Sequence, residues 1–108
     1  MRNVFLWITG VVFYVYILLL SNGQLYTGFT ADVRRRLAEH RNGAVDFTRN
    51  RLPVELIHYE AYALESDARR REKFLKTTEG KRLLRQQIRD ILVRKSVLSV
   101  DKIGADQI

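Results

Sequence analysis

The sequence predicts an α/β fold: a small sandwich in which a three-stranded, mainly antiparallel sheet carries flanking helices in the order β-β-α-β-α-α. Two observations lead to this fold class. An apolar run rich in β-branched and aromatic residues is followed by a tight-turn sequence and a second such run. Further along the chain, apolar and polar residues alternate as in a strand, and two segments with the apolar spacing of helices follow. The 108 residues amount to one domain.

The first two strands are predicted over residues 13–20 and 24–29. Ser21-Asn22-Gly23 lies between them, and Asn-Gly tolerates the positive φ values of a tight turn, so we expect antiparallel pairing. The uncharged run Val4–Leu20 is long enough to suggest a membrane span as an alternative. Thr9-Gly10 interrupt this run, however, and its β-branched and aromatic composition favours a strand buried on both faces.

The first helix is predicted to begin after a cap at Thr30 or Asp32, because both side chains can accept a backbone hydrogen bond. It carries apolar residues four apart and ends before Asn42-Gly43, a common helix stop. Residues 42–53 are expected to form a basic loop. The alternating residues 55–62 predict the third strand.

Two helices are predicted after the third strand. The first begins near Glu65 and runs to about Lys76. Thr77-Thr78 then end this helix and cap the next one, which ends near Val93. The chain thus divides into an apolar extension (1–12), the folded domain (13–93) and a loose tail (94–108). We expect no second domain and no internal repeat.

The composition excludes several kinds of function. The chain has no cysteine, which rules out disulfides, thiol catalysis and cysteine-bound metals. No signal-peptide cleavage site follows the apolar run, so we expect a cytoplasmic protein without a membrane partner. The net charge of +7 indicates a polyanionic partner, with nucleic acid foremost.

The positive charge is concentrated in two windows. Residues 34–51 carry a net charge of +4 and residues 69–95 a net charge of +8. Arginine is a good bidentate phosphate ligand, although charge runs often only solvate helix faces. The residues expected to contact nucleic acid are Arg34, Arg35, Arg41, Arg49, Arg69, Arg70, Lys73 and Lys76.

The two hairpin strands carry the tripeptides Val15-Tyr16-Ile17 and Tyr26-Thr27-Gly28. With these, the chain resembles the GIY-YIG endonuclease superfamily, in which each hairpin strand contributes such a tripeptide. The resemblance spans about residues 13–89 and is greatest to small stand-alone members related to the nuclease domain of bacterial excision-repair incision proteins. Further stretches in the family's order are Gly28-Phe29-Thr30, Arg36–His40, Asn42-Gly43, Thr48-Arg49, Pro53-Val54, Tyr59-Glu60 and Ala68–Glu72.

The chain departs from the family pattern at three points. Val15 replaces a glycine and Thr27 replaces an isoleucine, but both tyrosines and Gly28 remain. Many larger members also carry an asparagine after the metal-binding glutamate, and here no asparagine follows Asn50. One supporting site residue is therefore unassigned.

The resemblance implies a catalytic set. Tyr16 and Tyr26 would act as base and in orienting water, in an order that the sequence leaves open. Arg36 would bind phosphate, His40 would assist, and Glu72 would hold a single Mg²⁺ (or Mn²⁺).

The residues themselves are consistent with these roles. A tyrosine hydroxyl titrates near 10 and needs help to act as a base, while helical periodicity directs His40 at the sheet. The ordinary alternatives are a cross-strand aromatic pair, a surface arginine, a half-buried histidine and a carboxylate at a helix edge.

Three functions remain open. The first is a metal-dependent DNA endonuclease that acts in repair or processing, directed by DNA structure or by a specificity partner protein, on duplex or branched DNA. The second is a non-catalytic nucleic-acid-binding module of the same fold. The third is a membrane-tethered adaptor, for which the run Val4–Leu20 is the only argument. The sequence does not indicate an oligomeric state.

Overall fold

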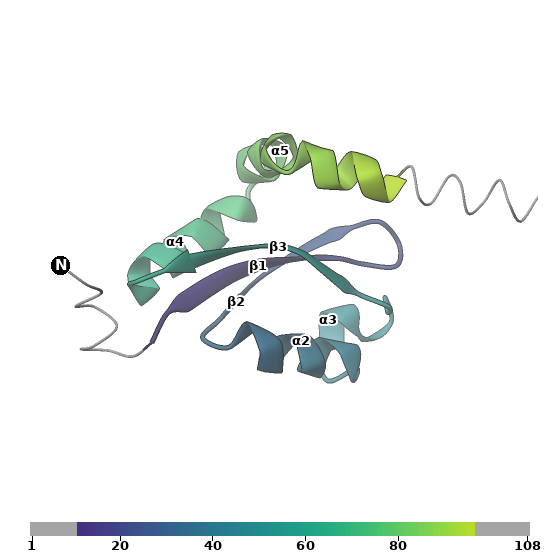
Figure 1. Ribbon diagram of the computed structural model, residues 1–108, viewed down its shortest axis with the longest axis horizontal. Helices are drawn as coiled ribbons and strands as arrows, with labels where there is room; N and C mark the ends of the chain where they lie inside the picture. Colours follow the sequence, from purple (N-terminus) through teal and green to yellow (C-terminus); the bar gives the residue numbers. More distant parts are fainter. Residues whose placement is uncertain (1–10, 97–108) are drawn as a thin grey trace, which may run out of the picture.

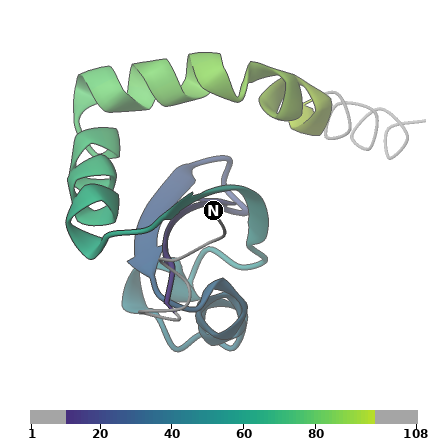
Figure 2. The same ribbon diagram turned by 60° about the vertical axis from the view of Figure 1, so that its left-hand side comes forward.

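The sheet lies in the middle of the molecule and has helices on both faces, as Figure 1 and Figure 2 show. The computed structural model describes residues 11–96. The strands follow the spatial order β2-β1-β3 with antiparallel pairing, and they are β1 (Phe13–Leu19), β2 (Leu25–Thr30) and β3 (Glu55–Tyr62). The predicted α/β fold with a three-stranded antiparallel sheet is confirmed. The labelled helices are α2 (Val33–Arg41), α3 (Asp46–Arg49), α4 (Glu65–Leu75) and α5 (Thr78–Gln87).

The β1–β2 hairpin closes at the predicted turn Ser21-Asn22-Gly23. Gly23 has a φ of 87°, a value that glycine adopts without steric cost. The closure sets the register of the hairpin, with Tyr16 opposite Gly28. Tyr26 lies two residues before Gly28 and so shares its face of the sheet. The two tyrosines are therefore diagonal neighbours on one face.

One face of the sheet packs against α4 and α5. Side chains alternate between faces along a strand, so Val15 and Ile17 both point to this side. They form a buried core with Ala68 and Leu75 of α4 and Leu84 of α5. This core fixes where α4 and α5 lie relative to β1.

The opposite face is covered by α2 and α3. Tyr16 and Leu18 point to this side and pack with Leu37 of α2. The helix α2 begins where predicted, because the Asp32 side chain accepts the Arg35 backbone N–H at 3.0 Å. The tyrosine-bearing face of β1 is thus held against α2.

The helix α3 corrects the prediction of a loop over residues 42–53. It is a single turn of four residues, and its N-cap residue Val45 makes no side-chain capping bond. So short a helix has no detectable periodicity and forms only with tertiary support. Its buried residue Thr48 supplies that support through a contact with α2 that is described below.

The ends of the folded domain differ in part from the predicted boundaries. A turn at residue 88 interrupts the last helix, and helical backbone then continues through residues 89–96. Lys95 in this segment forms an ion pair with Glu55 at the start of β3 at 2.5 Å. Residues 94–96 are therefore helical rather than part of a loose tail.

The proposed extension lies almost entirely outside the described residues, as does the tail from residue 97 onward. Residues 13–19, the strand-like part of the uncharged run, form β1 as predicted. Within residues 11–96, no helix has the length and apolar character that crossing a membrane requires.

Candidate active site

Tyr16 and Tyr26 lie close together on the α2-covered face of the sheet. Their ring centroids are 6.2 Å apart, with planes inclined at 39°. Tyr16 is 2% exposed, whereas Tyr26 is half-buried. The Tyr16 ring lies across Gly28, where an added Cβ atom would come within 2.2 Å of it. The two tripeptides of the hairpin thus form one structural unit.

His40 joins this unit from the last turn of α2. It is completely buried, and its Nε2 atom lies 2.9 Å from the Tyr16 hydroxyl oxygen. Its ring also makes an edge contact with Tyr26, at a centroid separation of 5.1 Å. The expected orientation of His40 toward the sheet agrees with this geometry, because the helical spacing places it on the same side as Leu37.

Thr48 of α3 contacts the other ring nitrogen of His40. Its hydroxyl oxygen lies 2.7 Å from Nδ1, and the same hydroxyl is 3.5 Å from the Val45 carbonyl oxygen. If Thr48 donates to that carbonyl, its oxygen accepts from the Nδ1–H of a neutral imidazole. Nε2 is then free to accept the Tyr16 hydroxyl proton. The result is a buried chain from Val45 through Thr48 and His40 to Tyr16.

The burial of this chain shifts both titrating groups. Burial raises the pKa of the Tyr16 hydroxyl to about 12, although hydrogen bonding from Arg36 acts in the opposite direction. Burial, followed by the positive charge of Arg36, lowers the pKa of His40 below its ordinary value. At neutral pH Tyr16 is therefore protonated and His40 is neutral, as a donor–acceptor pair requires.

Arg36 stands beside the tyrosines at the solvent side. Its guanidinium Nη1 donates to Glu39 Oε1 at 2.9 Å, and 36% of its side chain is exposed. Hydrogen bonding to Glu39 raises the pKa of Arg36, so the group stays charged. A partly exposed, permanently charged fork that interacts with the Tyr16 hydroxyl is suited to binding a phosphate.

Within residues 11–96, Glu72 makes no hydrogen bond or ion pair with the tyrosines, Arg36 or His40. It belongs to α4, which packs on the sheet face opposite the one that carries Tyr16. Its Oε2 atom accepts from Lys76 Nζ at 3.0 Å, and 20% of its side chain is exposed. The helix α4 nevertheless also contacts β2, the strand that carries Tyr26.

The donor set at Glu72 fits only a metal site with one protein ligand. Within residues 11–96, no three histidine, cysteine or carboxylate side chains cluster in a way that could hold a metal ion. Oε1 of Glu72 makes no hydrogen bond within that same part of the chain. Because Mg²⁺ keeps several waters and takes substrate phosphate oxygens, a single carboxylate is compatible with it.

The residues predicted to contact nucleic acid fall into two groups. Most form surface ion pairs with carboxylates, each of which typically contributes less than about 1 kcal/mol and is easily exchanged for a phosphate. These paired residues are Arg35, Arg49, Arg69, Arg70 and Lys76. In the described part of the chain, Arg34, Arg41 and Lys73 make no ion pair and are exposed.

Sequence reasoning did not assign a role to Thr48 or Phe47. Thr48 lies eight residues from His40 on a one-turn helix, so no periodicity links the two. Phe47, 50% exposed, packs against the Tyr26 ring at a centroid distance of 5.6 Å. A phenylalanine within a basic stretch was the available signal, since aromatic side chains among basic ones are typical of nucleic-acid-binding surfaces.

The arrangement agrees with comparisons to known proteins. Residues 12–85 match the profile of the GIY-YIG catalytic domain. The chain belongs to the GIY-YIG family. Its fold is therefore a nuclease-type fold, and the matched range includes both hairpin tripeptides.

The GIY-YIG chain also has relatives of similar size. A UPF0213 protein of Haloquadratum walsbyi is 44% identical over 81 residues, which cover 72% of this chain and 91% of the relative. Another, from Staphylococcus saprophyticus, is 36% identical over 73 residues, with 67% and 89% coverage. The solution NMR structure of a UPF0213 protein from Bacillus halodurans shares 35% identity, covers 70% of this chain and 84% of its own, and has a TM-score of 0.47. The name UPF0213 specifies no activity.

Proposed function

We propose that this GIY-YIG protein is a metal-dependent endonuclease that hydrolyses phosphodiester bonds in DNA. The observation that carries the proposal is the 2.9 Å hydrogen bond between the Tyr16 hydroxyl and His40 Nε2. A cross-strand aromatic pair with only a packing role needs no such bond to a buried, neutral imidazole. A hydrolase that uses this tyrosine as its base needs such a bond, because a tyrosine hydroxyl becomes a useful base only when its proton can leave.

In the proposed reaction, Tyr16 relays a proton. As water attacks the phosphorus atom, one water proton passes to the Tyr16 oxygen while the Tyr16 proton passes to His40 Nε2. The bond between phosphorus and the leaving oxygen breaks, and that oxygen takes a proton from solvent. His40 then returns its proton through Tyr16 to solvent, which restores both groups. Tyr16 thereby avoids ionising on its own, which its pKa of about 12 would make unfavourable.

Arg36 and Tyr26 complete the site from the more accessible side. Tyr16 is nearly buried, so the phosphate must approach its hydroxyl from where Arg36 and the half-buried Tyr26 meet solvent. Arg36 binds the non-bridging oxygens, and Tyr26 orients the attacking water. In this assignment Tyr16 relays the proton, because among residues 11–96 it is the tyrosine hydroxyl bonded to His40.

Glu72 is the residue that would hold Mg²⁺ or Mn²⁺. When bound, such an ion supplies positive charge to the non-bridging phosphate oxygens. Glu72 must exchange its ion pair with Lys76 for the metal, and a released Lys76 is free to contact the DNA backbone. We further propose that DNA structure or a partner protein selects the target in repair or processing.

A non-catalytic nucleic-acid-binding module is the second candidate. Two observations favour it: the low exposure of Tyr16 and the ion pair that neutralises Glu72. A protein that only binds would retain the basic surface and would tolerate loss of the Tyr16 hydroxyl without any functional change.

The deciding experiment incubates the purified protein with branched, nicked, duplex and single-stranded DNA in Mg²⁺, Mn²⁺ or EDTA. Cleavage that requires the metal supports the endonuclease. Tyr16→Phe should abolish it, whereas Tyr14→Phe, on the same strand, should not. His40→Gln should likewise be inactive and His58→Gln active, because His58 pairs with Glu60 rather than with a tyrosine. DNA binding without cleavage on every substrate would instead establish the binding module.

A further inference from the structure

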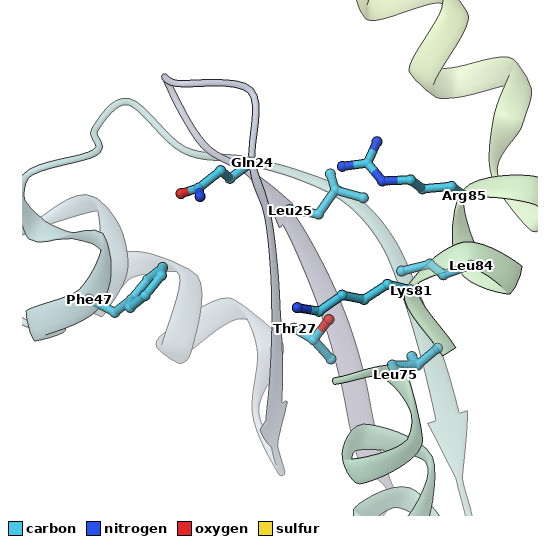
Figure 3. A pocket seen from close by; sticks show the side chains of 8 residues that line it. All are labelled: Gln24, Leu25, Thr27, Phe47, Leu75, Lys81, Leu84 and Arg85. Atoms are coloured by element: carbon cyan, nitrogen blue, oxygen red, sulfur yellow. The ribbon is translucent and has the colours of Figure 1, made fainter. Parts of the chain in front are cut away.

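A hollow of about 270 Å³ lies along β2, at the edge of the sheet. Figure 3 shows it with the helix α5 contributing one wall and Phe47 of α3 on the other side of the strand. Among residues 11–96, the strand order leaves β2 with a neighbouring strand on one side only. The lining residues are Gln24, Leu25, Thr27, Phe47, Leu75, Lys81, Leu84 and Arg85. Leu25, Leu75 and Leu84 of the core beneath α4 and α5 therefore form its apolar floor.

Lys81 and Arg85 are the charged groups of the hollow. They lie four residues apart on α5 and both are exposed. Across residues 11–96, neither side chain has a carboxylate or hydrogen-bonding partner. Like charges at this helical spacing repel and destabilise a helix. Two uncompensated cations that face one cavity are best explained by an anionic ligand.

The neighbouring Arg82 shows that α5 does not lack ion pairs in general. Its guanidinium forms a two-pronged contact with Glu79, at 2.7 and 3.1 Å. The helix thus pairs one cation with its own carboxylate and leaves unpaired the two that line the hollow. Arg82 has the same charge, the same helix and similar exposure, so it is a matched control.

The hollow is continuous with the tyrosine site. Phe47 lines it and also packs against Tyr26, at 5.6 Å between ring centroids. Arg51 lies over the Phe47 ring, with its guanidinium carbon 4.4 Å from the centroid. A chain that left the tyrosines along the edge of β2 would meet an aromatic ring first and then the two free cations of α5.

We propose that this hollow binds one nucleotide of a single nucleic-acid strand, next to the phosphate held at Tyr16 and Arg36. Lys81 and Arg85 bind its phosphate, and Phe47 and Leu25 contact the sugar and base. The volume favours one strand, because about 270 Å³ lies just below the roughly 300–1,000 Å³ of small-molecule pockets and leaves room for a single nucleotide at most. The inference rests on the proposed function for the adjacent site, but its test does not.

The test measures binding of a fluorescein-labelled oligothymidylate in EDTA, where cleavage cannot contribute, over a range of salt concentrations. Lys81→Gln and Arg85→Gln should each weaken binding about four- to tenfold near 0.1 M salt and lower the salt slope by roughly 0.7. Arg82→Gln removes the same charge but should change affinity less than twofold. Phe47→Leu should weaken binding about fivefold without changing the salt slope, since base stacking is not electrostatic.

Equal effects of Lys81→Gln, Arg85→Gln and Arg82→Gln would overturn the inference, because net charge alone would then explain binding. The inference would also be overturned if these substitutions weakened binding of a matched duplex but left binding of the single strand unchanged. The outcome is independent of the endonuclease proposal. If the parent never cleaves DNA but the three variants differ as expected, the hollow is a strand-binding site on a non-catalytic module.

Discussion

The Tyr16 ring rests directly on Gly28, its partner in the β1–β2 register. A Cβ atom at position 28 would lie 2.2 Å from the Cζ atom of Tyr16 and 2.3 Å from its hydroxyl oxygen. Both distances are far below van der Waals contact. Gly28 is buried within an extended strand, so its missing side chain, and not a special φ, is what the site uses.

Gly28→Ala should therefore destabilise the protein by about 1–3 kcal/mol and displace the Tyr16 hydroxyl from His40. Urea unfolding measures the first effect, and loss of cleavage measures the second. The control is the same substitution in a Tyr16→Ala background, where the ring is gone. If Gly28→Ala costs as much there, the clash is not with Tyr16.

Thr48→Val should change which nitrogen of His40 carries the proton. Valine keeps the shape of threonine but cannot accept from Nδ1–H, so the buried imidazole loses a hydrogen bond, at a cost of about 1–3 kcal/mol. ¹⁵N chemical shifts measured in a His58→Gln background report on His40 alone. We expect Nδ1 protonation in the parent and in Thr48→Ser, and a shift toward Nε2 protonation in Thr48→Val. Unchanged shifts in Thr48→Val would show that Thr48 does not set the tautomer.

Glu72→Gln should reduce cleavage by orders of magnitude while leaving the fold intact. The substitution removes the charge that would hold the metal but almost no volume, and loss of a Lewis acid forfeits several kcal/mol of transition-state stabilisation. DNA binding in EDTA should be unchanged or slightly tighter. Glu65→Gln is the control, because Glu65 lies on the same helix and is likewise ion-paired, with Arg69. Full activity of Glu72→Gln would place the metal elsewhere.

Glu60 should govern stability at acid pH. Burial alone would raise its pKa, but hydrogen bonds from Arg71, Tyr62 and His58 together lower the pKa of Glu60 to about 2. A lowered folded-state pKa stabilises the protein above the ordinary carboxyl value of 4.5, and this stabilisation is lost as the pH falls toward 2. The contribution is on the order of 3 kcal/mol.

Chemical denaturation of the parent and Glu60→Gln at several pH values measures this contribution. Glu60→Gln should be less stable than the parent at pH 7, and the difference should shrink as the pH falls below 4.5. A difference that stays constant down to pH 2 would mean that the carboxylate charge is not responsible.

Local chemistry made the hairpin, the capped helix α2 and the direction of His40 predictable. Asn22-Gly23 allows a tight turn, Asp32 accepts a backbone hydrogen bond, and helical spacing places His40 beside Leu37. Each of these features depends on residues that are close in sequence. For that reason they can be predicted without knowledge of the tertiary structure.

The contacts that complete the site could not be predicted in the same way. Thr48 reaches His40 from a helix too short to have a period, and Arg71 binds Glu60 across eleven residues. The position of Glu72 relative to the tyrosines depends on which face of the sheet α4 covers. A sequence that shows helix and strand periods does not reveal this choice.

The alternation of side chains along β1 links the position of the Tyr16 hydroxyl to the stability of the folded domain. Val15 and Ile17 anchor one core while Tyr16, between them, belongs to the other. The strand is paired on both edges and covered on both faces, so its backbone amides should exchange with solvent only when the whole domain opens. The Tyr16 hydroxyl is consequently held in place for as long as the protein stays folded. Any motion needed to admit a substrate must come from Tyr26, Arg36 and the rim around them.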